Sequence, residues 1–265
     1  MNFKSGLRVL AAGVALVGSV TTAMATPFPG PDAFVYSGAN IPFNFRDISA
    51  AGTQAFGGAD TDDSVTGAVP IGFAFSFYGT PYTSAYIGSN GFITFSPGQL
   101  EGCCNGGPLP GTTTASNLVA GWFTDLVSGS PGVGDNIYYQ TLGSAGSREF
   151  IVEYLNNPYF FNTPNSNTFE IILHEGTNDI ELQYNRTSAD GHTRSVGIEN
   201  LGGTIGLQAI NDNTSLLNRQ GLCISTGSTS CPTNAVPEPG SLAMASLSLL
   251  IVGAMRRKRK QNTGC

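Results

Sequence analysis

Three aspartates in a glycine-rich stretch are the residues of this sequence whose type and spacing best suit the binding of a cation. Asp60, Asp62 and Asp63 follow directly on Gly57-Gly58-Ala59. Calcium is held by several hard oxygen ligands, and carboxylates supply them. The stretch does not have the twelve-residue pattern that ends in a bidentate glutamate. We therefore interpret it as a solvated acidic loop and keep calcium binding as the alternative.

Groups suited to nucleophilic catalysis are few. Asp190, His192 and Ser195 lie close together in the chain, and His174 stands in an alternating apolar stretch. A catalytic triad is defined by geometry, and the sequence has no G-x-S-x-G nucleophile elbow, no phosphate-binding loop and no H-E-x-x-H zinc motif. We predict a non-enzymatic protein without catalytic residues. A secreted hydrolase is the last of the alternatives.

The cysteines fit an oxidising compartment. Cys103, Cys104, Cys223 and Cys231 allow three pairings. The pair Cys223–Cys231 closes a short loop and is the simplest choice, while the alternative joins Cys103 or Cys104 to one of these two. No histidine and no C-x-x-C spacing accompanies them, which argues against a zinc site. Cys265 lies in the predicted removable tail.

The elements that must position these side chains are strands, beginning with residues 69–95. Phe73, Phe75 and Phe77 alternate with smaller or polar residues. This two-residue period places the three rings on one face of a half-buried strand. Ser89-Asn90-Gly91 then predicts a tight hairpin turn, because Asn and Gly tolerate positive φ angles. The stretch is typical of a β-sandwich core.

Further stretches extend the β pattern in both directions. Two hairpins are predicted, over residues 136–155 and 168–184, with strands over 194–199 and 204–210 after them and short strands over 34–36 and 43–45 before them. Residues 97–116 and 156–167 are predicted loops. The single tryptophan, Trp122, stands in an apolar run and is predicted to be buried in the core. The 35 glycines and the many aromatic residues favour an all-β fold.

Charge is distributed unevenly along the chain. Seven of the 12 basic residues lie near the two ends, and the body between them has no lysine. Five arginines remain there with most of the 18 acidic residues, so the body is strongly acidic. Nucleic acid is excluded as a partner, because its phosphates require Lys and Arg. An acidic body suits an exported protein that meets divalent cations.

The first 25 residues have the pattern of a secretory signal peptide. Lys4 and Arg8 form a positive region, an apolar run follows, and Ala23-Met24-Ala25 is an A-x-A cleavage site with Ala23 and Ala25 as its small residues. We predict a signal helix over residues 1–25 that is removed on export.

The C-terminal end combines three features. A Val236-Pro237-Glu238-Pro239-Gly240 box precedes a short apolar run, and a basic cluster of Arg256, Arg257, Lys258 and Arg259 follows it. The apolar run is short for a bilayer core of about 30 Å. Basic residues directly after it would stay cytoplasmic. We predict a linker over residues 233–241 and a short hydrophobic helix with a basic tail over 242–265, inserted only transiently in the inner membrane.

This tail resembles the PEP-CTERM sorting signal. The body, residues 26–232, resembles the nidogen-like (NIDO) extracellular domain. The second resemblance rests on the aromatic strand, Tyr82, Ser89-Asn90-Gly91 and the Trp122-to-Leu126 run, and on later strands up to residue 210. The resemblances imply a nidogen-like β-sandwich flanked by two helices. They also imply processing by an exosortase-type membrane protease in a Gram-negative cell.

The expected function follows from both resemblances. They imply a protein exported through the inner membrane to the cell surface or the extracellular space. Its expected partners there are an extracellular protein or a polysaccharide matrix, in adhesion or a biofilm. The alternative is a secreted module that binds calcium or carbohydrate. No cofactor is predicted beyond that possible calcium ion.

Overall fold

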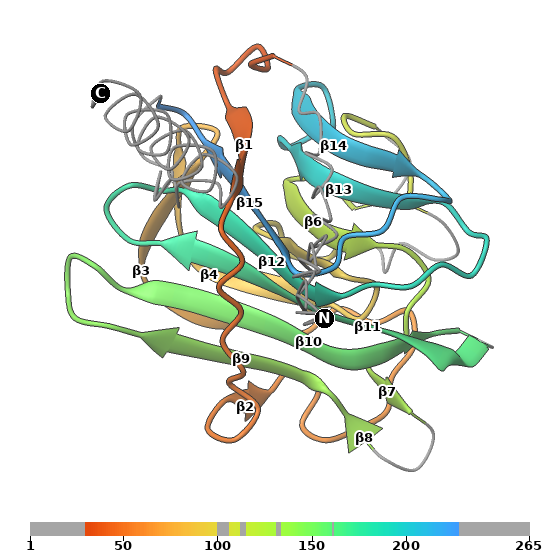
Figure 1. Ribbon diagram of the computed structural model, residues 1–265. Coiled ribbons are helices and arrows are strands. Elements are labelled where there is room, and N and C mark those ends of the chain that lie inside the picture. Colours follow the sequence, from red (N-terminus) through yellow and green to blue (C-terminus); the bar gives the residue numbers. More distant parts are fainter. Residues whose placement is uncertain (1–29, 100–105, 112–114, 131–133, 161, 228–265) are drawn as a thin grey trace, which may run out of the picture.

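The computed structural model describes residues 30–99, 106–111, 115–130, 134–160 and 162–227. All regular structure in these residues is β, arranged in antiparallel sheets (Figure 1). The predicted all-β sandwich is confirmed for this part of the chain. Within it, no helix is long and apolar enough to cross a membrane. The predicted signal helix, Pro-Glu-Pro linker and C-terminal helix lie outside the described residues.

The larger sheet, here called sheet A, has seven strands. In spatial order its strands are β1 (Ser37–Ile41), β15 (Gln220–Ser225), β12 (Ile180–Arg186), β11 (Asn162–His174), β10 (Glu149–Tyr159), β9 (Ile137–Leu142) and β2 (Thr53–Gln54).

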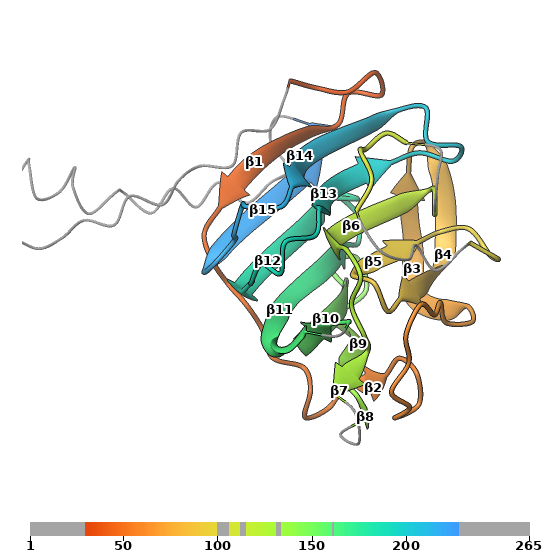
Figure 2. The ribbon, with the colours of Figure 1, turned by 90° about the vertical axis from the view of Figure 1, so that its right-hand side faces the viewer.

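The second sheet, sheet B, has six strands and packs face to face on sheet A (Figure 2). In spatial order its strands are β14 (Gly206–Asp212), β13 (Arg194–Glu199), β6 (Leu118–Phe123), β5 (Phe92–Thr94), β4 (Thr80–Gly88) and β3 (Val69–Phe77). A two-stranded ribbon pairs β7 (Gly129–Ser130) with β8 (Gly134–Asp135).

Aromatic side chains fill the space between the sheets. Phe73, Phe75 and Phe77 alternate inward from β3, as their spacing predicts. Trp122 is fully buried in the same core, which confirms its predicted place. Burial of such rings is worth about 1.5–3 kcal/mol for each side chain. The inner faces of the two sheets therefore supply the main stabilisation of the sandwich.

Two buried tyrosines of sheet A bond across the core to the backbone of sheet B. The Tyr154 hydroxyl donates to the carbonyl oxygen of Gly88 at 2.8 Å, and the Tyr184 hydroxyl donates to that of Gly121 at 2.6 Å. Burial raises the pKa of both phenols well above the ordinary value. The hydroxyls therefore remain protonated donors and tie the sheets at fixed points.

The three predicted hairpins are confirmed by the strand pairing of β4 with β5, β9 with β10 and β11 with β12. The two strands predicted over residues 194–199 and 204–210 are β13 and β14, which also pair. The Ser89-Asn90-Gly91 turn lies between β4 and β5, with Gly91 at a φ of 81°.

Three local predictions are wrong. Residues 34–36 form a turn instead of a strand, because the Asp32 carboxylate accepts the backbone N–H of Phe34 and of Tyr36. Residues 43–45 form no strand, although Phe43 and Phe45 alternate. The predicted polar loop over residues 156–167 is mostly strand, since β10 and β11 extend into it through a bulge.

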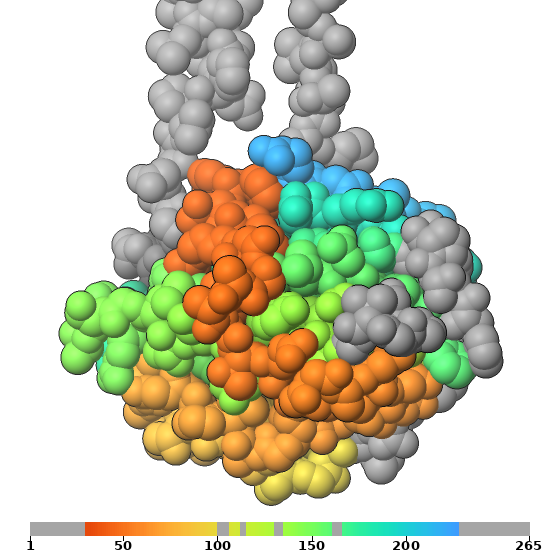
Figure 3. Space-filling model, turned by 90° about the horizontal axis from the view of Figure 1, so that it is seen from below, coloured from red at the N-terminus to blue at the C-terminus, as the bar shows by residue number. Residues whose placement is uncertain are grey.

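Residues 42–52, here called the strap, lie across the outer face of sheet A. Figure 1 shows this coil leaving β1 and passing in front of β12, β11, β10 and β9 on its way to β2. Alternate backbone N–H groups of the strap donate to side chains of three successive strands. These bonds are Asn44 to Gln183 Oε1 (2.8 Å), Arg46 to Glu170 Oε2 (3.1 Å) and Ile48 to Glu153 Oε2 (2.8 Å). Figure 3 shows the segments between β1 and β3 spread over the lower face.

The outer face of sheet B is covered in the same way. Leu109 and Ala115, from the described parts of the long loop before β6, pack on Phe92 and Leu118. The backbone N–H of Gly111 donates to Glu199 Oε2 at 2.7 Å. Part of each sheet is thus covered on its outer face, and both covering segments bond to side chains of the strands beneath them.

Replacing Tyr184 by phenylalanine is expected to lower the free energy of unfolding by about 1–2 kcal/mol, because the buried Gly121 carbonyl loses its donor. Urea denaturation measures this change. The matched control is Tyr86→Phe, since Tyr86 is half-buried and lies between the inward-facing Ala85 and Ile87 of β4. An equal loss in both variants would contradict the tie between the sheets.

Candidate functional site

Three carboxylates meet where the loop before β3 approaches the end of β6. One oxygen each from Asp62, Asp63 and Asp125 lies within 4.8 Å of the other two, and all three side chains are half-buried. We call this group the acidic trio. Two of its members come from the predicted acidic stretch. The third predicted residue, Asp60, is exposed and is not part of the group.

Asn90 positions the trio. Its Nδ2 donates to Asp63 Oδ1 at 2.8 Å, while its Oδ1 accepts the backbone N–H of Leu126 at 3.0 Å. The Asn90 side chain is fully buried and therefore links the acidic loop to the residues after β6. Gly91 allows this close approach, because a Cβ atom there would lie 2.1 Å from the Trp122 carbonyl oxygen. The Ser-Asn-Gly turn thus serves the site as well as the hairpin.

The electrostatics of the trio favour a positive ligand. Burial, followed by the charges of Asp62 and Asp63, raises the pKa of Asp125 to about 6. Burial and the charge of Asp63 also raise the pKa of Asp62. The Oδ1 atom of Asp125 is shielded from solvent and has no hydrogen-bond partner among the described residues. A divalent cation at the trio would relieve the repulsion and occupy that oxygen.

Asp190 and His192 lie near the trio. Asp190 Oδ2 and His192 Nδ1 are 2.6 Å apart, and a charge on His192 lowers the pKa of Asp125. Ser195 is buried, and its hydroxyl donates to the Gly107 carbonyl and accepts from Asn211 Nδ2. The bonds of Ser195 therefore run to the long loop and to β14, away from the Asp190–His192 pair. These contacts are not those of a catalytic triad.

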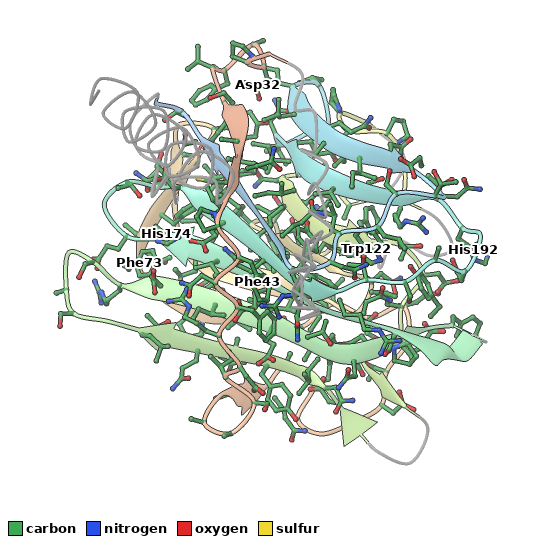
Figure 4. All side chains as sticks on the ribbon, in the orientation of Figure 1. Asp32, Phe43, Phe73, Trp122, His174 and His192 are labelled. Carbon is green, nitrogen blue, oxygen red and sulfur yellow. The ribbon has the colours of Figure 1, made fainter. Side chains whose placement is uncertain are left out.

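The aromatic residues next to the trio belong to the core. Trp122 Nε1 donates to the Tyr159 hydroxyl at 3.1 Å, and the Arg194 guanidinium carbon lies 5.2 Å from the centre of the Trp122 ring. Figure 4 shows Trp122 inside the molecule and His192 at its edge. Tyr159 is buried, whereas Phe160 is 36% exposed. Trp122 and Tyr159 are thus members of the main core.

His174 lies on the opposite side of the molecule, on the outer face of sheet A. Its Nε2 is 3.0 Å from Glu181 Oε2, and its Nδ1 is 3.4 Å from Glu149 Oε1. The histidine therefore joins two carboxylates beside the strap. Sequence reasoning placed His174 correctly in a strand but did not identify these partners, which come from strands on either side of β11.

Cys223 of β15 is disulfide-bonded and buried. Cys103, Cys104, Cys231 and Cys265 lie outside the described residues. The pairing of Cys223 with Cys231 stays a prediction. Ala23, Ala25 and the predicted sorting residues of the tail also lie outside the described part of the chain.

Comparison with protein families identifies the body of the chain. The family described as NIDO related matches residues 26–238. The chain belongs to the NIDO-related family. Neither a curated protein nor a solved structure matches the chain significantly. In this NIDO-related protein the acidic trio therefore lies within the domain that defines the family.

A second match covers the C-terminal end. The PEP-CTERM protein-sorting motif matches residues 235–260. This range contains the predicted Val236-to-Gly240 box and the basic residues Arg256 to Arg259. A PEP-CTERM motif marks an exported surface protein that an exosortase recognises. The NIDO-related domain is thus the part of the chain that is delivered outside the cell.

Replacing Asn90 by alanine is expected to lower the free energy of unfolding by about 1–3 kcal/mol, because it leaves the Leu126 N–H and Asp63 without a buried partner. Thermal and urea denaturation measure the loss. Asn213→Ala is the matched control, since Asn213 is exposed and its loss is expected to cost less than about 0.5 kcal/mol. Equal stability of the Asn90→Ala variant and the unmodified NIDO-related protein would refute the linking role.

Proposed function

We propose that this protein is a non-enzymatic component of the bacterial cell surface or extracellular matrix that acts by contact in adhesion or a biofilm. In this proposal the Gram-negative cell exports the chain, an exosortase removes the tail, and the body then binds a protein or polysaccharide of the matrix. The observation that carries the proposal is the arrangement of the two family matches. The NIDO-related match covers residues 26–238, and the match to the sorting motif covers residues 235–260 at the end of that domain.

The described surface exposes only scattered apolar side chains. Several large apolar side chains remain exposed on separate turns and loops outside the core. They are Phe34 (36%), Val35 (60%), Phe160 (36%), Leu201 (64%) and Leu216 (44%). Exposed apolar side chains contribute to protein interfaces when they lie within a polar surround.

The sorting tail can be tested in the producing cell. Replacing the five basic residues 256–260 by glutamine is expected to stop removal of the tail, because the basic cluster holds that end in the cytoplasm. The chain is then expected to accumulate in the inner membrane at the expense of the surface and the medium. Cell fractionation and mass spectrometry of the mature C-terminus measure the change, with Arg219→Gln in the body as the control.

Two results would count against the proposal in different ways. An intact basic tail on the mature native protein would indicate a retained anchor and contradict exosortase processing. Unchanged attachment and aggregation of cells that lack the gene would contradict the adhesion role while leaving export intact.

A second candidate function is calcium-dependent binding, and the acidic trio favours it. The unpartnered, shielded Asp125 Oδ1 and the repulsion among the three carboxylates are what a calcium ion would satisfy. Asp62, Asp63 and Asp125 would be the protein ligands. Water or backbone oxygens would complete the coordination shell of about six to eight oxygens that calcium takes. Such an ion would hold the acidic loop against the end of β6 and shape the surface there.

Calorimetric titration with calcium chloride tests this second candidate. Asp125→Asn is expected to weaken binding by about tenfold or more, because it removes a charged ligand. Asp60→Asn is the matched control, since Asp60 is exposed and outside the trio. Affinity is expected to fall as the pH drops through about 6, where Asp125 takes up its proton.

Equal weakening by Asp60→Asn, or no calcium-dependent heat with the unmodified protein, would refute calcium binding at the trio. Glycan-array binding with and without EDTA separates the two candidate functions. A glycan signal that EDTA abolishes favours the second.

A further inference from the structure

The strap over sheet A rests on two carboxyl groups that are fully buried. Glu153 and Glu170 each have zero exposed surface. Each uses its Oε2 atom to accept a backbone N–H of the strap, from Ile48 and Arg46 respectively. Each Oε1 atom is shielded from solvent and has no hydrogen-bond partner among the described residues. Both buried side chains thus leave their Oε1 atom without a hydrogen-bond partner among the described residues.

The strand register places these two groups side by side. Glu153 of β10 is directly opposite Glu170 of β11, and both project from the outer face, since their neighbours Val152, Tyr154, Phe169 and Ile171 lie in the core. Directly opposed residues of an antiparallel pair have Cβ atoms about 4.5–5.5 Å apart. Carboxyl groups on side chains of this length reach each other from such positions. If both were ionised, two buried like charges would be adjacent.

We propose that Glu153 and Glu170 share one proton between their Oε1 atoms and that this proton holds the strap on sheet A. A carboxylic acid of one residue then donates to the carboxylate of the other. One hydrogen bond satisfies both unpartnered atoms and removes one of the two buried charges. The Oε2 atoms remain free to accept the strap N–H groups.

The electrostatic surroundings keep the pair protonated. Burial raises the pKa of Glu170 to about 8 and that of Glu153 to about 7; the backbone N–H and the charge of Arg46 oppose the shift of Glu170, and the Glu153 charge adds to it. Burial also acts to raise the pKa of Glu181, but hydrogen bonds from His174 and Gln183 outweigh it and lower that pKa. The Glu153–Glu170 pair therefore keeps at least one proton through neutral pH.

Other titratable or charged groups face the pair from each element around it. They are Arg46 and Asp47 on the strap, Glu149 on β10, His174 on β11, Glu181 on β12 and Tyr138 on β9. Figure 4 shows His174 of β11 and Phe43 of the strap on this side of the sheet. Arg46 is ion-paired with Glu149, and His174 lies between Glu149 and Glu181. The Arg46 charge also acts on the pair, because it lowers the pKa of Glu170 and so opposes the effect of burial.

The direction of the pH effect follows from the raised pKa values. A carboxyl group with a folded-state pKa above its ordinary value of 4.5 stabilises the fold fully at low pH, and this contribution is lost as the pH rises through the folded-state value. Between pH 5 and 8 the unfolding equilibrium constant is therefore expected to rise by up to about tenfold per pH unit for one shared proton. The strap is expected to loosen over the same range.

The test uses Glu170→Gln in the purified protein. The glutamine keeps an acceptor for the Arg46 N–H and supplies a permanent donor to Glu153, so it imitates the protonated pair. We expect the fall in melting temperature between pH 5 and 8 to shrink by about half or more relative to the unmodified protein. In the variant, the hydrogen-exchange rate of strap peptides should rise only by the factor of about ten per pH unit that base catalysis of amide exchange itself produces.

Glu175→Gln is the matched control. Hydrogen bonding to Arg148 lowers the pKa of Glu175 to about 2, so its stabilising effect is lost only as the pH falls below about 4.5 and the interval from pH 5 to 8 is unaffected. This variant should keep the full pH dependence of the unmodified protein.

Carbon-13 NMR of labelled glutamate carboxyls in the unmodified protein gives a readout that does not require the variant to fold. Sharing predicts two well-separated apparent pKa values for the pair, the upper one above neutrality. In Glu170→Gln, or in the reciprocal Glu153→Gln, sharing predicts that the remaining carboxyl titrates at a lower pH than before. Two carboxyls fully ionised at pH 6, or a remaining carboxyl with unchanged titration, would overturn the proposal.

Discussion

The structure depends on one constraint: a buried backbone N–H group must find an acceptor. Part of the outer face of each sheet is covered by a segment that runs across the strands and forms no strand of its own there. The strap satisfies this constraint with Glu153, Glu170 and Gln183. The long loop over sheet B does so with Glu199 and Gln208. Glu153, Glu170 and Gln183, which are polar residues of outward-facing strand positions, are therefore buried acceptors.

This solution has an electrostatic consequence. Carboxyl groups placed under a covering segment lose water, and burial raises the pKa of Glu153, Glu170 and Glu199 to about 7, 8 and 7. The acidic trio differs, because it lies at the rim and its members are only half-buried. Each inner carboxyl accepts a backbone N–H group of a covering segment with its Oε2 atom, whereas the trio brings three carboxylates within 4.8 Å of one another. Position relative to the covering segments thus distinguishes carboxyls that bond to a covering segment from carboxyls that repel one another at the rim.

The same architecture suits a protein that works outside the cell. Part of each sheet is covered on its outer face, β15 carries a disulfide-bonded cysteine, and hydroxyls of Tyr154 and Tyr184 tie the two sheets. Such a body keeps its shape while its turns and loops present side chains to the surroundings. The NIDO-related match covers this body and the PEP-CTERM match covers the end of the chain, so the folded domain and the sorting signal follow one another along one chain.

Local pattern was sufficient for much of this protein. The alternation of Phe73 with its neighbours and three hairpins, one of them at Ser89-Asn90-Gly91, were readable from the sequence, because side-chain period and turn chemistry are local properties. The same pattern misled at Phe43 and Phe45, where alternation exists but no neighbouring strand does. Tertiary structure alone decided which distant residues meet: Asp125 joins Asp62 and Asp63 across a large gap in the chain, and Glu153 meets Glu170 under the strap. Spacing along the chain does not encode such meetings, since they depend on how β6 lies beside the acidic loop and on where the strap crosses sheet A.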